Sequence, residues 1–265
     1  MAIDAYDFSE DEVRSRLHVL FEAAKEADEF EFGCTLLRVR GLESAGWDPF
    51  NETHQLVEDL MTLVGAPLIP HTKVRLGLLL YSHLTEVGAM YEVLANLTRV
   101  VAGERYVLDP FLEHYPRNRK GEPRFLSTPG QVRALSEMLA GVGHGGVGET
   151  LDWFFHATLR NAFAHADYTL HGDEFRSRSE WFERGGVRTS ELPLDVLADV
   201  VNRALAFYDA FMQEYDELRR GYRANKVISG RISGGPDREP VELLADPQRG
   251  LYGFRSPPEE ATPAE

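Results

Sequence analysis

The sequence predicts a mainly α-helical bundle with a small β-hairpin inserted before its last long helix. Apolar residues recur at helical spacing along most of the chain, the hydrophobic period changes to two only around residue 170, and no internal repeat is present. The chain has 265 residues, of which 43% are hydrophobic and 27% are charged, so it can bury a sizeable core.

The first two helices are predicted from capping and stop signals. Ser9 and Glu12 form a capping box, and the apolar spacing after it predicts a helix that runs into the thirties. Asn51 can cap a second, shorter helix that Gly65 and Pro67 end. The residues expected to point inward from that helix are Leu56, Val57, Leu60, Leu63 and Val64.

The middle of the chain predicts three more helices and one irregular stretch. The longest apolar stripe predicts a helix over 76–101 that ends at Gly103. Residues 104–127 hold three prolines and a basic turn and are expected to be irregular. Thr128 is expected to cap a helix that reaches about Ala140, and after a glycine cluster another helix is expected over 149–166.

The last third changes character twice. Segments 168–170 and 174–176 predict a hairpin, with a third short strand around 187–189. Pro193 opens a long helix that Gly221 stops. We therefore expect an acidic N-terminal helical region (1–50) packed on the bundle, a helical domain (51–221), and a C-terminal extension (222–265) whose last ten residues are disordered.

Charge and cysteine content narrow the class of protein. The net charge of −15 argues against a protein that coats nucleic acid, although residues 218–232 carry a local charge of +5. Cys34 is the only cysteine, which excludes an intrachain disulfide and a four-cysteine metal cage. No stretch is apolar enough to span a membrane, and the acidic start does not resemble a secretory signal, so we expect a cytoplasmic protein.

Two possible sites are interpreted as structural. The cluster GVGHGGVGE lacks the Lys-Ser or Lys-Thr of a phosphate-binding loop and does not follow a strand, so it predicts a connection between helices. His83 and Glu86 have a spacing that permits a shared metal ion, but His83 lies in an apolar stripe, which favours a core histidine. We expect no metal and no cofactor.

The segment 151–170 is the most informative part of the sequence. It places Arg160, Asn161 and His165 on the last turns of an otherwise apolar helix, where charged groups must reach water or find partners. Arg160 and His165 point about 140° apart on an ideal helix, which turns about 100° per residue. A long side chain, a loosened helix end or a second subunit is needed to bring both to one point.

The run R-N-A-F-A-H, from Arg160 to His165, resembles the R-x4-6-H motif of the HEPN (higher eukaryotes and prokaryotes nucleotide-binding) superfamily. The resemblance includes a polar residue after the arginine and is strongest over 151–170. It implies a helical bundle, commonly dimeric, and a metal-independent endoribonuclease of a toxin, abortive-infection or other antiviral defence system. RNA, a second copy of the chain and an antitoxin or defence-system protein are the partners it implies.

The resemblance also assigns roles to residues. His165 would act as general acid–base, Arg160 would hold the scissile phosphate, and Asn161 would orient the imidazole or donate to phosphate. The product would be a 2′,3′-cyclic phosphate. The residues expected to bind the RNA substrate are Arg117, Arg119, Lys120, Tyr168, Arg220 and Arg223.

Two interpretations of the motif stay open besides catalysis. In one, the chain is a non-catalytic module that binds a nucleotide or a protein, which the acidic composition favours. In the other, Arg160 and Asn161 satisfy neighbouring carbonyls and His165 closes the helix end. Tyr168 lies three residues after His165, whereas a toxin subgroup of the superfamily carries a modified tyrosine two residues after it, so that modification is not transferred.

Overall fold

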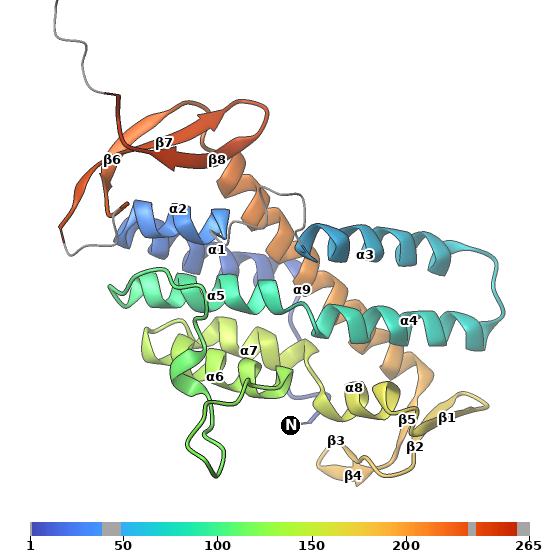
Figure 1. Ribbon diagram of the computed structural model, residues 1–265. Helices are drawn as coiled ribbons and strands as arrows, with labels where there is room; N and C mark the ends of the chain where they lie inside the picture. The colour runs from blue at the N-terminus through green and yellow to red at the C-terminus, as the bar shows by residue number, and fades with distance from the viewer. Residues whose placement is uncertain (1, 39–48, 233–236, 259–265) are drawn as a thin grey trace, which may run out of the picture.

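The computed structural model describes residues 2–38, 49–232 and 237–258, and it is mainly helical (Figure 1). The expected mainly α class is confirmed. A 3-10 turn, η2 (Leu112–His114), lies in the stretch predicted to be irregular. The α-helices are α1 (Glu10–Ala27), α2 (Glu29–Leu37), α3 (Pro49–Gly65), α4 (Pro70–Thr85), α5 (Gly88–Val101), α6 (Thr128–Gly141), α7 (Gly145–Phe154), α8 (Ala157–Ala164) and α9 (Leu194–Arg220).

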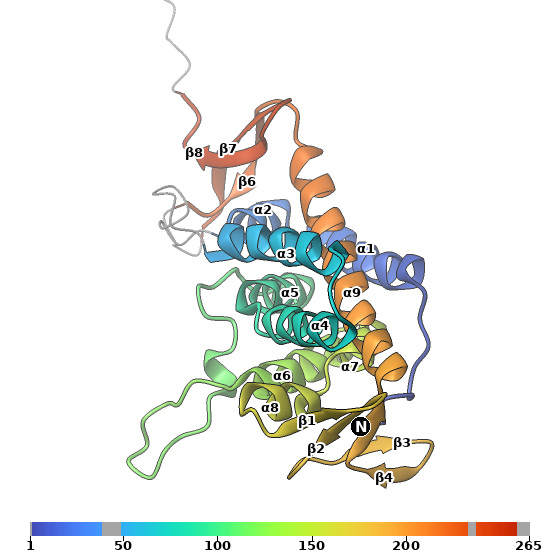
Figure 2. The ribbon, with the colours of Figure 1, turned by 90° about the vertical axis from the view of Figure 1, so that its right-hand side faces the viewer.

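Three small antiparallel sheets lie in the described part of the chain. The first has the strand order β1 (Tyr168–His171), β2 (Glu174–Ser177), β5 (Glu191–Pro193), and the second pairs β3 (Phe182–Arg184) with β4 (Val187–Thr189). Both lie before α9. The β1–β2 hairpin and strand β4 were predicted, whereas β3 and β5 were not. The third sheet, β6 (Lys226–Gly230), β7 (Glu239–Asp246) and β8 (Gly250–Arg255), lies at the opposite end of the molecule (Figures 1 and 2). It was not predicted.

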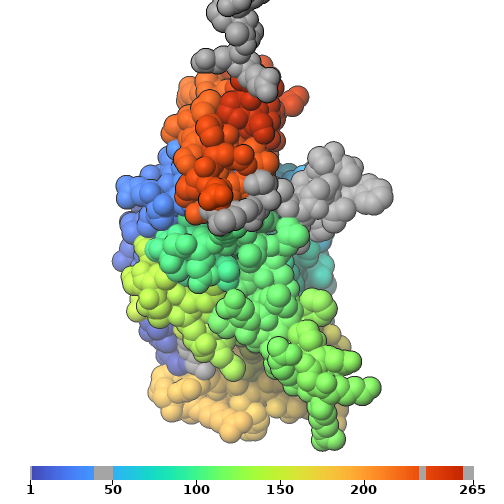
Figure 3. All heavy atoms as spheres, turned by 60° about the vertical axis from the view of Figure 1, so that its left-hand side comes forward, coloured from blue at the N-terminus to red at the C-terminus, as the bar shows by residue number. Residues whose placement is uncertain are grey.

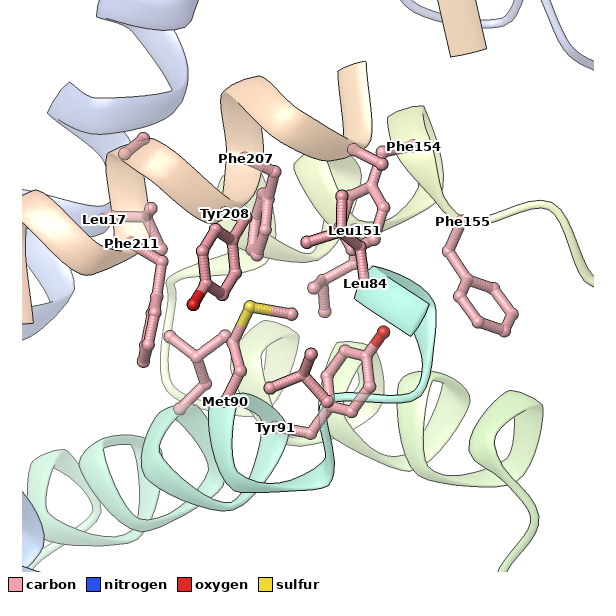
Figure 4. Close-up of a cluster of buried hydrophobic side chains, with 14 of the residues drawn as sticks. Leu17, Leu84, Met90, Tyr91, Leu151, Phe154, Phe155, Phe207, Tyr208 and Phe211 are labelled. Carbon is pink, nitrogen blue, oxygen red and sulfur yellow. The ribbon is translucent and has the colours of Figure 1, made fainter. Parts of the chain in front are cut away.

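The long helix α9 organises the core. It packs against α1, α4 and α7, and its inward face carries Phe207, Tyr208 and Phe211, each 2% exposed or less (Figure 4). The Phe207 ring stacks on Phe154 of α7 at 4.5 Å between centroids. Leu17 of α1 belongs to the same cluster, so the acidic N-terminal helix buries its apolar face in the common core.

Three of the helices that the sequence predicts as continuous are broken in the structure. Asp28 ends α1 and accepts hydrogen bonds from the Phe30 and Glu31 amides at the start of α2. Between α4 and α5, the Tyr91 hydroxyl donates to the free Thr85 carbonyl at 3.0 Å. Each break occurs where a side chain can satisfy the backbone groups that the interruption leaves open.

Several helix details also differ from prediction. Helix α3 begins at Pro49, so Asn51 lies inside it, and Leu56 and Leu63 are exposed rather than inward. Helix α6 begins at Thr128, and its N-cap is Ser127 rather than the predicted Thr128. The Thr128 hydroxyl donates to the Glu86 carboxylate instead. Residues 259–265 of the predicted disordered tail lie outside the described residues.

The glycine cluster serves helix packing. Gly143 has φ +83° and ends α6, and Gly148 lies inside α7 against α6. A Cβ added at Gly148 would lie 3.4 Å from the Cα atom of Ser136. The cluster therefore lets α6 and α7 turn sharply and approach each other, as expected for a connection, but most of it is helical rather than a loop.

Candidate functional site

The break that creates α8 comes from a buried tyrosine. The backbone N–H of His156 donates to the Tyr81 hydroxyl at 2.8 Å, and that hydroxyl donates to the Phe154 carbonyl at 3.1 Å. Tyr81 is fully buried in α4, so this bridge fixes the start of α8 against α4. The helix predicted over 149–166 is therefore wrong as one element, and Arg160 sits in the middle of a helix of eight residues.

Arg160 is held by an acidic partner. Its Nε donates to Oε1 of Glu86 at 2.6 Å, and Nη1 donates to Oδ1 of Asn161 at 3.1 Å. The second carboxylate oxygen of Glu86 accepts from the Thr128 hydroxyl at 2.6 Å. We call Glu86, Arg160 and Thr128 the Glu86 bridge, because it joins the end of α4 to α8 and to the start of α6.

The Glu86 bridge leaves part of the guanidinium available. The Arg160 side chain is 26% exposed, and within the described ranges no group pairs with Nη2. A guanidinium carries five N–H donors, of which Glu86 and Asn161 take one each. Arg160 thus keeps donors for an incoming acceptor, but Glu86 offsets its charge.

His165 lies at the C-cap of α8 and is exposed. Its imidazole has no hydrogen-bond or ion-pair partner in the part of the chain that the structure describes. The next residue, Ala166, adopts φ +52°, and the amides of Ala166 and Asp167 donate to Phe163 and Ala162. These two bonds form a Schellman motif, which ends the helix just after His165.

The backbone keeps a nearly helical conformation up to His165, with φ −93° and ψ 6°. The loosened helix end that would bring His165 toward Arg160 is therefore not realised before the histidine. Neither residue lines the five cavities that the described part of the chain forms around His156, Arg38, Cys34, Arg99 and Ser136. None of these five cavities brings Arg160 and His165 together.

The other predicted substrate-binding residues are spread over the molecule. Arg117, Arg119 and Lys120 lie in the exposed loop before α6, which protrudes at the end of the molecule opposite the β6–β8 sheet (Figure 3). Arg117 donates to the Gly121 carbonyl at 2.8 Å and closes the turn of that loop. This loop and α8 belong to the same half of the molecule, since the Glu86 bridge connects α6 to α8.

Tyr168 and the C-terminal arginines are placed differently. The Tyr168 ring stacks on Phe175 at 5.1 Å, as part of the β1–β2 hairpin. Arg220 pairs with Asp216 at 3.0 Å, and Arg223 is exposed just beyond α9. Helix α9 is 27 residues long, or about 40 Å at 1.5 Å per residue, so its C-terminal arginines are far from α8.

Two residues near α8, Glu86 and His156, have surroundings in the structure that the sequence did not indicate. The sequence indicates Glu86 only as a possible metal partner of His83, whereas in the structure Glu86 pairs with Arg160. His156 begins α8 and is 5% exposed, and burial, followed by the charge of Arg203, lowers the pKa of His156 to about 4. The sequence signal for His156 is its position, directly after the aromatic run 153–155 and four residues before Arg160.

His83, whose spacing from Glu86 would permit a shared metal ion, is half-buried. Burial lowers the pKa of His83, and its Nε2 is enclosed without a partner among the described residues, so His83 is not the core histidine with satisfied hydrogen bonds that the sequence favoured. Over residues 2–38, 49–232 and 237–258, no three potential ligands gather into a metal site. Among the same residues, no helix combines the length and apolar character needed to cross a bilayer.

Comparisons of this chain with protein families, with curated proteins and with solved structures find no match. The residues of α8 and their surroundings are therefore the features of the molecule that indicate a function.

Proposed function

We propose that this protein is a metal-independent endoribonuclease of HEPN type, with a role in a toxin, abortive-infection or other defence system. The observation that carries the proposal is the state of the two motif side chains. The His165 imidazole is exposed without a partner among the described residues, and Arg160, on the same short helix, keeps Nη2 donors available. These are the groups that cleavage of RNA without a metal requires.

In the proposed reaction, His165 takes the proton from a ribose 2′-hydroxyl or gives one to the leaving 5′-oxygen. An imidazole suits both tasks near neutral pH. Attack of the 2′-oxygen on phosphorus breaks the bond to the 5′-oxygen and leaves a 2′,3′-cyclic phosphate. Arg160 binds the phosphate oxygens through Nη2, and Asn161, whose Oδ1 accepts from Arg160, holds the guanidinium in place.

We further propose that the active unit is a symmetric dimer that joins the α8 ends of two chains. The helical backbone up to His165 separates the two motif side chains by about 140° around the helix axis, which favours assembly of each site from two chains. The basic loop with Arg117, Arg119 and Lys120 lies in the same half of the molecule and would guide RNA to that interface.

The test is cleavage of an oligoribonucleotide in EDTA. We expect the wild type to produce 2′,3′-cyclic phosphate ends, His165→Ala to lose cleavage, and a substrate with one 2′-deoxyribose at the cleaved position to resist. His171→Ala is the matched control, because His171 is also exposed and lies six residues further along the chain. Cleavage that needs a divalent metal, or that survives in His165→Ala, would refute the proposal.

The Glu86 bridge favours a second candidate, a non-catalytic module that binds a nucleotide or a protein partner such as an antitoxin. In that case Arg160 joins three helices, and its charge serves the ion pair with Glu86 rather than a phosphate. An intact, folded dimer that cleaves no RNA, in which Arg160→Ala only lowers stability, would favour this candidate over the nuclease.

A further inference from the structure

The loop before α6 folds back on itself as a two-stranded finger, which we define as residues 115–125. Arg117 and Pro123 face each other in an antiparallel β-bridge. At the tip, Oδ1 of Asn118 accepts from the Lys120 amide at 2.8 Å. The finger protrudes from the molecule (Figure 3), and these contacts within it hold its backbone in a defined shape.

The base of the finger presents an aromatic ring to solvent. Tyr115 and Phe125 lie two residues outside the bridged pair, and their rings meet edge to face with 5.3 Å between centroids. The Tyr115 hydroxyl donates to Oδ2 of Asp109 at 2.7 Å, which anchors that ring to the body. Leu126 packs against the core, but the neighbouring Phe125 is 82% exposed. A single exposed apolar side chain is common on protein surfaces, so the charges around Phe125 decide what it indicates.

The finger concentrates positive charge on an acidic chain. Four basic side chains are exposed on it, and none of them forms an ion pair with a carboxylate in the described part of the chain: Arg117, Arg119, Lys120 and Arg124. The acid of the finger, Glu122, accepts from Nδ2 of Asn118 at 2.7 Å. The whole chain has a net charge of −15, so this excess of positive charge is local. An open ring among such cations fits a partner that carries both flat faces and repeated negative charges.

We propose that the finger binds single-stranded RNA, with one base stacked on the Phe125 ring and the adjoining phosphates on the four cations. Single-stranded RNA offers base faces to an aromatic side chain, whereas neighbouring bases cover those faces in a duplex. The inference rests on the proposed RNA substrate but not on cleavage. It makes the substrate a single strand, and it gives Phe125 the role of a substrate-binding residue.

The finger is close enough to α8 for one RNA segment to reach both. Three chain steps separate Phe125 from Thr128, which is about 11 Å at full extension. Thr128 and Arg160 each contact the Glu86 carboxylate at 2.6 Å. A base on Phe125 therefore lies within a few nucleotides of a phosphate held by Arg160.

The test is fluorescence anisotropy with a labelled oligouridylate and, in parallel, a blunt RNA duplex. All variants carry His165→Ala, so that the RNA stays intact. Phe125→Leu removes the ring but keeps an apolar side chain. We expect it to raise the dissociation constant for the single strand about tenfold, because base stacking is lost, and to leave that for the duplex nearly unchanged. Phe125→Trp should bind the single strand at least as tightly as phenylalanine does.

Leu112→Ala is the matched control, because Leu112 is 56% exposed in the same loop and has no aromatic face. It should leave both RNA affinities unchanged. The proposal is overturned if the single strand does not bind, if Phe125→Leu binds it as the parent does, or if Leu112→Ala loses as much affinity as Phe125→Leu.

Two other partners of the finger are tested with the same variants. If Phe125→Leu abolishes binding to anionic phospholipid vesicles, or dissociates a dimer in analytical ultracentrifugation, while RNA affinity is unchanged, the ring contacts a membrane or a second chain and the RNA proposal fails. Cleavage is scored separately in chains that keep His165. Binding that needs Phe125 without any cleavage refutes the nuclease and keeps the finger, whereas cleavage with an unchanged KM in Phe125→Leu does the reverse.

Discussion

Glu86→Gln is the substitution that best separates the two roles open to Arg160. Glutamine keeps an oxygen for the Thr128 hydroxyl but removes the charge that pairs with Arg160 at 2.6 Å. The two side chains are 26% and 39% exposed, so the ion pair is worth about 1 kcal/mol. We expect the free energy of unfolding to fall by about that amount, which corresponds to a melting point lower by about 2–3 °C.

RNA affinity should change in the opposite direction. If Arg160 binds phosphate, its ion pair with Glu86 competes with the RNA by about 1 kcal/mol. Removing that competition should lower the dissociation constant for RNA about fivefold. The assay is fluorescence anisotropy with a labelled oligoribonucleotide, in a His165→Ala background so that the RNA stays intact. Urea denaturation of the same proteins measures stability.

Glu137→Gln provides the control, because Glu137 is an exposed acid of α6 and no cation pairs with it in the described part of the chain. It changes the net charge equally and should alter neither stability nor affinity. If Glu86→Gln lowers stability but leaves RNA affinity unchanged, the reasoning is refuted, and Arg160 serves only to join the helices.

Three further outcomes follow from the structure. Burial lowers the pKa of His156 to about 4, below the ordinary 6.5, so the unfolded chain takes up a proton before the folded chain does as the pH falls. The free energy of unfolding, measured by urea denaturation, should therefore drop by about 2 kcal/mol from pH 7 to pH 5. The His156→Gln variant should lack this loss. Ala166→Gly should raise stability by about 0.5–1 kcal/mol, because φ +52° strains alanine, and a decrease would contradict the Schellman assignment. Phe207→Ala should cost about 3–5 kcal/mol, as measured by the same denaturation, and a cost below 1 kcal/mol would contradict its central place in the core.

The sequence was sufficient for the helical class, for the hairpin at 168–176 and for the limits of α9, because each has strong local signals. The breaks at Asp28, after Thr85 and at Phe155 were not predictable from periodicity. After Thr85 the buried Tyr91 hydroxyl of the next helix satisfies the backbone, and at Phe155 the buried Tyr81 hydroxyl of α4 does so. Helical periodicity shows neither contact.

The C-terminal sheet was missed for a similar reason. Gly and Pro residues over 222–265 predict irregular structure, but Gly250 (φ +70°) lies where a Cβ would be 2.3 Å from the Arg219 carbonyl oxygen. Glycine there permits close contact of β8 with α9 rather than flexibility.

The candidate site was predicted in part. The motif and the exposure of its histidine could be anticipated from an apolar helix that ends in charged residues. The Glu86 bridge could not, because 74 residues separate Glu86 from Arg160, and a single sequence does not pair residues across that distance.

The most direct test of the proposed nuclease is complementation between two inactive variants. If each site combines Arg160 of one chain with His165 of another, mixing Arg160→Ala with His165→Ala creates dimers that hold one complete site. With free exchange, half of the dimers are mixed, so about one quarter of the wild-type cleavage should return. An inactive mixture, in the presence of an active wild type, would contradict a site shared between two chains, and an inactive wild-type dimer would contradict the nuclease itself.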